Sequence, residues 1–130
     1  MTFDGSYYRL DGSRFLPKPA HDIPIWIGGG VEASFRRAVE KGDRFHVVGL
    51  KPPDVVPIVE RLSRERPETT FTISARTGWD PPGMDPAVIR DENAAYAEAG
   101  VQHMVAAPWQ KEIDSWLKPM DLLTELGGLT

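Results

Sequence analysis

Three consecutive glycines, Gly28 to Gly30, are the chain's most promising candidate for ligand chemistry. They follow a short apolar run that ends at Ile27 and precede a stretch of helical periodicity that begins at Val31. Backbone without Cβ atoms can approach an anion closely, and a helix start adds unpaired N–H groups and the positive end of the helix dipole. The spacing matches neither the G-x-G-x-x-G fingerprint nor the P-loop. The stretch therefore indicates either a phosphate cradle or a plain strand-to-helix turn.

No other group of reactive side chains forms a convergent motif. The chain has no cysteine, which excludes disulfides, thiolate chemistry and cysteine-ligated zinc. His21, His46 and His103 lack the i, i+4 pairing of an H-E-x-x-H zinc site, and we interpret the last two as residues that pack within a sheet. There is also no G-x-S-x-G nucleophile elbow. We therefore assign no catalytic residue and expect no metal site.

Short apolar runs alternate with longer stretches of helical periodicity from residue 23 onward. We expect strands at residues 25–27, 44–48, 70–75 and 101–106, each followed by a helix, at residues 31–41, 54–66, 85–99 and 113–126. Pro57 is expected in the first turn of the second helix, and Pro119 is expected to kink or divide the last one. Consecutive βα units predict an α/β domain with parallel strands over residues 23–130, preceded by an N-terminal arm or hairpin at residues 1–22.

Charge and composition exclude several classes of function. The chain has 130 residues, of which 41% are hydrophobic, enough for one domain with a core. Its net charge is −4 and its basic residues are scattered, so we expect no nucleic-acid partner. Its apolar runs are only a few residues long and no charged leader opens it, so we expect no membrane partner and a cytoplasmic location.

Several short segments of the chain together resemble one known family. They are residues 3–8 (FDGSYY), 16–19 (LPKP), 24–30 (PIWIGGG), 36–38 (RRA) and 42–43 (GD). In this order and spacing they are similar to the second half of the luciferase-like monooxygenases, and the βα rhythm agrees over the remainder. That family folds as a TIM barrel and includes FMN-dependent monooxygenases and reductases that use the deazaflavin coenzyme F420.

The resemblance implies that this chain is half of a barrel. It would place Ile25, Phe45, Ile73 and Val105 in the fifth to eighth barrel strands. A complete barrel of this type needs about 250 residues. The first four strands have no counterpart in this sequence, so we expect four βα units, with dimerisation as one way to complete the barrel.

The resemblance also implies where a cofactor binds, because the family's glycine turn and helix start contact the cofactor phosphate. Val31 stands where family members often have a serine, whose hydroxyl would add a hydrogen bond. Arg76, at the predicted barrel rim, either pairs with phosphate or is a solvated loop residue. The implied cofactor-binding residues are Gly28, Gly29, Gly30, the N–H groups of Val31 and Glu32, Arg76 and Thr77.

Three of the four tryptophans have two interpretations each. Trp79 in the predicted loop 76–83, and Trp109 after the last strand, either stack on a cofactor ring or cover the barrel rim. Trp26 lies within the first predicted strand, and we interpret it as a core residue rather than as a wall of the cofactor site.

Two functions from different classes remain open. The first is a flavin- or deazaflavin-dependent oxidoreductase or monooxygenase of the luciferase-like class, present here as its C-terminal half. The second is a non-catalytic half-barrel remnant, or a cofactor-binding subunit that works only through self-association or with a partner half. Half a barrel has two open strand edges and an uncovered inner sheet face, which we expect to be apolar. Two copies would then pair into a barrel, or the helices would rearrange over a flavodoxin-like sheet.

Overall fold

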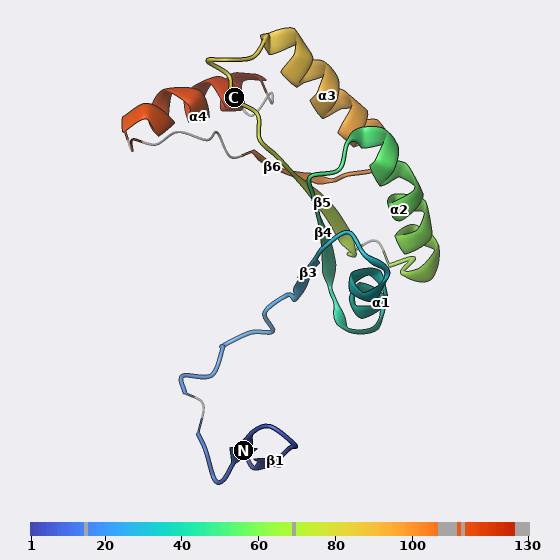
Figure 1. Ribbon diagram of the computed structural model, residues 1–130, viewed down its shortest axis with the longest axis vertical. Coiled ribbons are helices and arrows are strands. Elements are labelled where there is room, and N and C mark those ends of the chain that lie inside the picture. Colours follow the sequence, from blue (N-terminus) through green and yellow to red (C-terminus); the bar gives the residue numbers. More distant parts are fainter. Residues whose placement is uncertain (15, 69, 107–111, 113, 127–130) are drawn as a thin grey trace.

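The computed structural model describes residues 1–14, 16–68, 70–106, 112 and 114–126. Its centre is a parallel sheet of four strands in the order β3-β4-β5-β6, and one helix follows each strand (Figure 1). This confirms the predicted α/β fold of alternating βα units. The elements are β1 (Phe3–Asp4), β2 (Arg9–Leu10), β3 (Trp26–Gly28), α1 (Glu32–Lys41), β4 (Arg44–Val48), α2 (Pro52–Glu65), β5 (Thr72–Thr77), α3 (Pro86–Glu98), β6 (His103–Ala106) and α4 (Asp114–Leu126).

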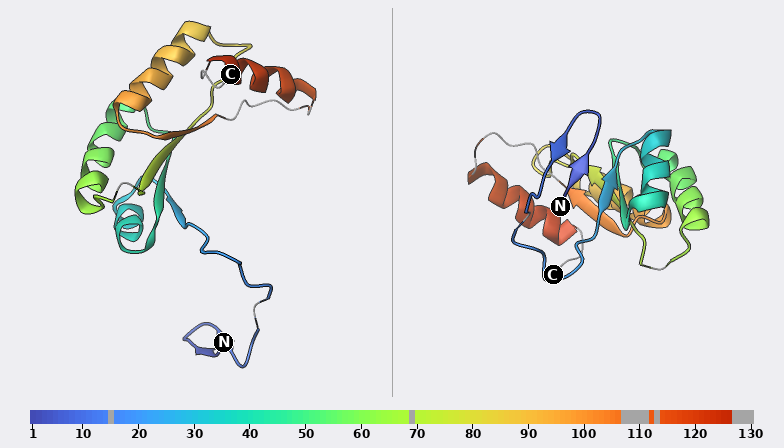
Figure 2. Two further views of the ribbon diagram at one scale, coloured as in Figure 1. Left: turned by 180° about the vertical axis from the view of Figure 1, so that it is seen from behind. Right: turned by 90° about the horizontal axis from the view of Figure 1, so that it is seen from below.

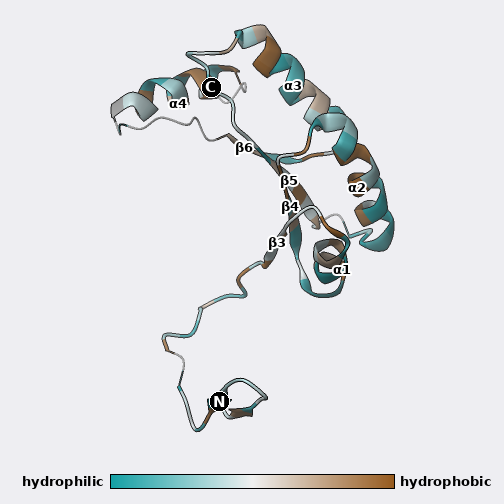
Figure 3. Ribbon diagram, in the orientation of Figure 1, coloured by the Kyte–Doolittle hydropathy of each residue, from teal (hydrophilic) through white to brown (hydrophobic). Residues whose placement is uncertain are grey.

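The hydrophobic core lies between the sheet and the helices α1, α2 and α3, which cover the same face (Figure 2). Alternate strand residues point to it, and Phe45, Val47, Ile73 and Ala75 are each no more than 2% exposed. Hydrophobic and hydrophilic residues alternate along α2 and α3, as expected for helices with one buried side (Figure 3). Because the four strands are parallel neighbours, their carboxyl ends lie side by side along one edge of the sheet.

The end of α1 is connected to α2 by one arginine. α1 ends at Lys41, as the sequence predicts, and the N–H of its C-cap residue Gly42 donates to the Ala38 carbonyl at 3.0 Å. Arg66 Nη1 donates to the carbonyls of Ala38, Val39 and Gly42 at 3.2, 3.1 and 2.6 Å. The last turn of a helix leaves its carbonyls without intrahelical partners, so Arg66 supplies the missing donors.

Two helices differ from the sequence prediction at their prolines. α2 begins at Pro52, because Pro52 and Pro53 both fit the first turn of a helix, where no N–H is needed. Pro57 therefore lies inside the helix, and its predicted place in the first turn is wrong. Pro119 lies inside α4 without dividing it.

Two strands end later than predicted. β3 includes Gly28. β5 continues to Thr77, because its ladder with β6 extends to the pair Thr77 and Ala106. Arg76 is thus a strand residue, and the prediction of a loop that begins at this position is wrong.

The other face of the sheet has no described helix over it (Figure 2). α4 lies beyond β6, near α3 (Figure 1). The N-terminal segment leads away from β3 and ends in the β1–β2 hairpin, whose Arg9 and Asp4 form an ion pair at 2.9 Å (Figure 1). The fold therefore presents an open sheet face that side chains of all four strands line.

Candidate functional site

The glycine turn, Gly28 to Gly30, joins β3 to α1 at the carboxyl end of the sheet. Gly29 has a φ of 145°, which other residues rarely adopt, and a Cβ there would lie 2.7 Å from Ser34 Oγ. A Cβ on Gly30 would have no neighbour within 4 Å, and one on Gly28 would meet only the His46 carbonyl oxygen at 3.8 Å. Packing therefore requires glycine at position 29 but not at the other two, where a ligand has room to approach the backbone.

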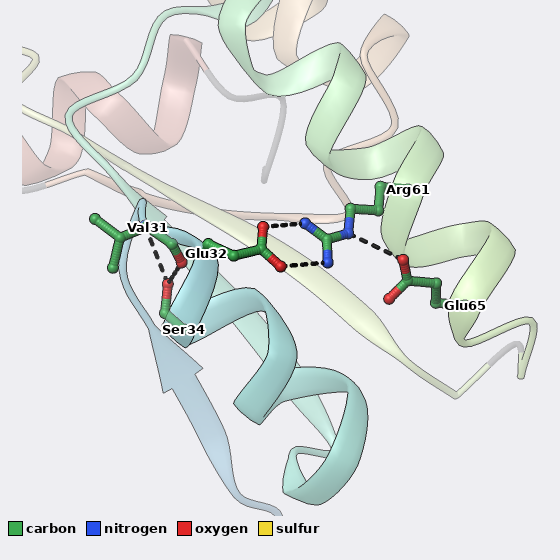
Figure 4. Close-up of polar contacts among 5 residues, drawn as sticks. All are labelled: Val31, Glu32, Ser34, Arg61 and Glu65. Carbon is green, nitrogen blue, oxygen red and sulfur yellow. Dashed lines mark hydrogen bonds and ion pairs between the residues drawn. The ribbon is translucent and has the colours of Figure 1, made fainter.

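Ser34 organises the first turn of α1. Val31 is the N-cap residue, and its N–H donates to the Ser34 hydroxyl at 3.2 Å (Figure 4). The same hydroxyl donates to the Val31 carbonyl at 2.6 Å. The Val31 N–H, which the sequence predicts to contact phosphate, thus already has an acceptor within the chain. The Glu32 N–H is the first of the helix and lies at the positive end of its dipole.

The side chain of Glu32 turns toward α2 (Figure 4). Its two carboxylate oxygens accept hydrogen bonds from Arg61 at 2.6 and 2.8 Å, and Arg61 Nε donates to Glu65 at 3.0 Å. The Arg61 hydrogen bonds lower the pKa of Glu32, so its carboxylate is ionised at neutral pH. A free carboxylate at this helix start would repel an anionic ligand, whereas pairing with Arg61 compensates its charge.

Arg76 and Thr77 are adjacent in β5 and therefore point to opposite faces of the sheet. Both line a cavity of about 160 Å³, together with Lys51, Trp79 and Glu92. Thr77 is 8% exposed, and its Oγ1 has no hydrogen-bond partner among the described residues. The glycine turn does not line this cavity. The structure thus places the predicted phosphate contacts in two separate groups at the carboxyl edge of the sheet.

The tryptophans differ in their surroundings. Trp79 is 6% exposed, and its indole N–H donates to Glu92, which also accepts from Lys51 Nζ at 2.6 Å. It therefore covers the rim. Trp26 is 38% exposed, because its strand position faces the open side of the sheet, and the Arg44 guanidinium lies 5.0 Å from its ring. Its prediction as a core residue is wrong. Trp109 lies outside the described residues.

A polar pair on the open sheet face was missed by the sequence reasoning. His46 Nδ1 lies 2.7 Å from Ser74 Oγ. Burial lowers the pKa of His46, and the charges of Arg76 and His103 act in the same direction, so the imidazole is neutral at neutral pH. The period of two in the predicted strands would have placed residues 46 and 74 on one face, but the sequence does not contain the register that pairs them.

This pair does not form a nucleophilic centre. A serine beside a histidine is the arrangement of an activated hydroxyl, but Ser74 is fully buried and so closed to a substrate. Among residues 1–14, 16–68, 70–106, 112 and 114–126, no cluster of three or more His, Cys, Asp or Glu side chains could hold a metal ion. Over the same ranges no helix combines the length and apolarity needed to cross a membrane.

Sequence comparison finds relatives over most of the chain. A profile of the family described as luciferase-like monooxygenase matches residues 1–109. An uncharacterized protein of Mycobacterium tuberculosis is 31% identical over 72 residues, which cover 55% of this chain and 25% of that protein. The F420-dependent glucose-6-phosphate dehydrogenase of Nakamurella multipartita is 36% identical over 55 residues, or 42% of this chain and 16% of that enzyme. The enzyme of the same name from Intrasporangium calvum is 28% identical over 89 residues, which cover 62% of this chain and 27% of that enzyme.

Structural comparison extends the likeness to nearly the whole chain. The solved structure of an F420-dependent secondary alcohol dehydrogenase in complex with an F420-acetone adduct superposes with a TM-score of 0.71. It covers 98% of this chain and 56% of that chain at 16% identity. The likeness shows that the fold is shared, and this chain spans little more than half of the neighbour and about a quarter or less of the matched sequence relatives.

Proposed function

We propose that this chain, which belongs to the luciferase-like monooxygenase family, binds the deazaflavin coenzyme F420 through its phosphate and is the cofactor-binding half of an oxidoreductase. One observation carries the proposal: the backbone at Gly30 borders open space immediately before the start of α1. Two relatives and the structural neighbour are named as F420-dependent enzymes, which supports this coenzyme over FMN.

The geometry of the turn fits a phosphate group. The backbone at Gly28 and Gly30 would approach the phosphate, and the Glu32 N–H would donate to it. Ser34 and Arg61 act indirectly. The Ser34 hydroxyl accepts from the Val31 N–H and so fixes the turn, and Arg61 compensates the charge of the Glu32 carboxylate. The bound coenzyme would supply hydride-transfer chemistry at its deazaflavin ring. Arg76 and Thr77 would lie at the same edge of the sheet, in the neighbouring cavity.

The open sheet face favours a second candidate, a cofactor-binding subunit that has no activity by itself. The Ser74 hydroxyl beside His46 is fully buried, and the face that would be the interior of a barrel has no described element over it. Completion of the barrel then needs a partner half, and a second copy of the chain is the simplest one. Sedimentation velocity at micromolar concentration tests this, since a compact monomer would reject pairing of two copies.

Titration with F420 and with FMN, followed by tryptophan fluorescence and calorimetry, tests cofactor binding. We expect F420 to bind at micromolar concentration and FMN to bind more weakly. The proposed function fails if neither binds at high micromolar concentration.

Two matched variants locate the site. Gly30→Asp places a carboxylate before the start of α1, where its Cβ would meet no heavy atom beyond the adjacent residues, and it should weaken F420 binding about tenfold or more by repelling the phosphate. Gly12→Asp makes the same chemical change in the N-terminal segment, at a φ of 61° that aspartate tolerates and without a neighbour within 4 Å. It should leave the affinity unchanged, and equal losses in both variants would exclude the glycine turn as the phosphate site.

A further inference from the structure

The tripeptide Asp-Gly-Ser occurs twice in the N-terminal segment, at residues 4–6 and 11–13. The first copy begins at the last residue of β1 and the second directly follows β2, so both belong to the same hairpin. A backbone can rearrange spontaneously at an aspartate followed by glycine, because glycine has no Cβ to hinder attack of its nitrogen on the aspartate side chain. The hairpin therefore contains two chemically identical sites in different surroundings.

The rearrangement starts with attack of the glycine backbone nitrogen on Cγ of the aspartate. The N–Cγ bond forms, the Cγ–OH bond breaks, and the hydroxyl leaves as water with the hydrogen of the nitrogen, which gives a cyclic succinimide. Water then adds to the former main-chain carbonyl and breaks its bond to the nitrogen. The product is isoaspartate, whose backbone runs through the side-chain carbonyl and is one methylene longer. Water is released and taken up again, so the reaction needs no other reactant.

Asp4 is held away from this reaction. Its two carboxylate oxygens accept hydrogen bonds from Arg9 Nε and Nη2 at 2.9 and 3.1 Å, so its side chain is directed toward the opposite strand of the hairpin. The Gly5 N–H donates to the Tyr8 carbonyl at 3.0 Å within the turn. Both reacting groups would have to give up these bonds before the ring could close.

Asp11 is exposed and lacks these restraints. Its carboxylate makes no hydrogen bond or ion pair with residues 1–14 or with any other residue that the structure describes. The Gly12 nitrogen lies 3.5 Å from Thr2 Oγ1, which is longer than an ordinary N–H···O hydrogen bond. A Cβ at Gly12 would meet no heavy atom within 4 Å beyond the adjacent residues, so the ring has space to form.

We propose that Asp11 is a site of spontaneous isomerisation to isoaspartate and that the ion pair with Arg9 protects Asp4 from the same reaction. The added methylene would lie immediately beyond β2, whose last residue, Leu10, pairs with Phe3. It would change the spacing between this pair and the residues that follow it. The inference concerns the N-terminal segment and does not depend on cofactor binding.

Peptide mapping of the full chain during prolonged incubation in neutral buffer tests the proposal. Aspartate and isoaspartate peptides have the same mass but separate by chromatography, and fragmentation by electron transfer assigns the position. We expect isoaspartate to accumulate at residue 11 about fivefold or more faster than at residue 4, the factor that one retained hydrogen bond would give. In urea, where the hairpin contacts are lost, the two sites should convert at similar rates.

Two results would overturn the proposal. One is conversion of both sites at equal rates in the folded chain. The other is absence of isoaspartate at residue 11 after a period that produces it in the unfolded chain.

Three variants test the role of each group. Arg9→Ala should raise the rate at residue 4 toward the rate at residue 11, whereas Arg14→Ala, at another exposed arginine of the segment, should leave it unchanged. Asp11→Glu keeps the charge but would have to form a six-membered ring, which closes more slowly, so it should remove the signal at residue 11 while circular dichroism shows the same fold. An unchanged rate at residue 4 in Arg9→Ala would contradict protection by the ion pair.

Discussion

Alanine substitutions at Gly29 and Gly30 should have opposite effects, because only Gly29 is required by the backbone. An alanine at Gly29 would adopt a φ of 145°, and such a conformation costs about 1–3 kcal/mol for a residue other than glycine. Its Cβ would also lie 2.7 Å from Ser34 Oγ, which would displace the acceptor of the Val31 N–H at a cost of about 1 kcal/mol. The expected loss of stability is thus about 2–4 kcal/mol.

Gly30→Ala should be neutral or stabilising. Apart from the two adjacent residues, no heavy atom lies within 4 Å of the added Cβ, and the backbone is not in the left-handed region. The substitution reduces the conformational entropy of the unfolded chain, which stabilises a protein by about 0.4–1 kcal/mol. The same Cβ fills the space through which a phosphate would approach, so affinity for F420 should fall while stability does not.

Urea unfolding followed by tryptophan fluorescence, together with F420 titration of the folded variants, separates the two effects. The reasoning is refuted if the Gly29→Ala chain is as stable as the unmodified chain. It is also refuted if Gly30→Ala destabilises the fold by more than about 1 kcal/mol, because the open space inferred beside it would then be absent.

Three further substitutions test the polar contacts of Arg66, His46 and Arg61. Arg66→Ala removes the donor to three carbonyls at the end of α1 and should cost about 1.5–3 kcal/mol in urea unfolding, with Arg64→Ala as an exposed control. The pKa of His46 is lower in the folded chain than its unfolded value of 6.5, so the unfolded chain binds more protons and stability falls as the pH drops through 6.5. His46→Gln should flatten this dependence between about pH 5 and pH 7 in thermal unfolding; an unchanged slope would contradict the assignment. Arg61→Ala leaves the Glu32 carboxylate uncompensated and should weaken F420 binding, which the additional change Glu32→Gln should restore.

The order of the elements could be predicted from the sequence because hydrophobic periodicity reports it directly. The alternation of strands and helices from β3 to α4 follows from residue types along the chain, and so does the end of α1 just before Gly42. The wrong end of the third predicted strand depends on pairing between segments. β5 continues through Arg76 because β6 offers it a ladder, and no local preference of these residues reports that partner.

The candidate site was predictable only as a location. The sequence places three glycines before a helix, but it does not tell which of them the backbone requires. That distinction depends on Ser34, whose Oγ would lie 2.7 Å from a Cβ at position 29, and the conformation of the turn determines this distance. The Glu32–Arg61 pair joins residues 29 positions apart, and it exists because α1 and α2 pack side by side on one face of the sheet. Tertiary structure therefore decides whether the helix start repels or accepts an anion.

The prediction of an apolar inner face was wrong, and the reason bears on how this chain behaves. Half a TIM barrel normally exposes branched apolar side chains, and burying them contributes about 25 cal/mol per Å². Here Arg44, His46 and Arg76 occupy inward positions, and the exposed apolar area is confined largely to Trp26 and two valines. Exposure of such a face to water costs less, so collapse of the helices over it or pairing of two copies is less strongly driven.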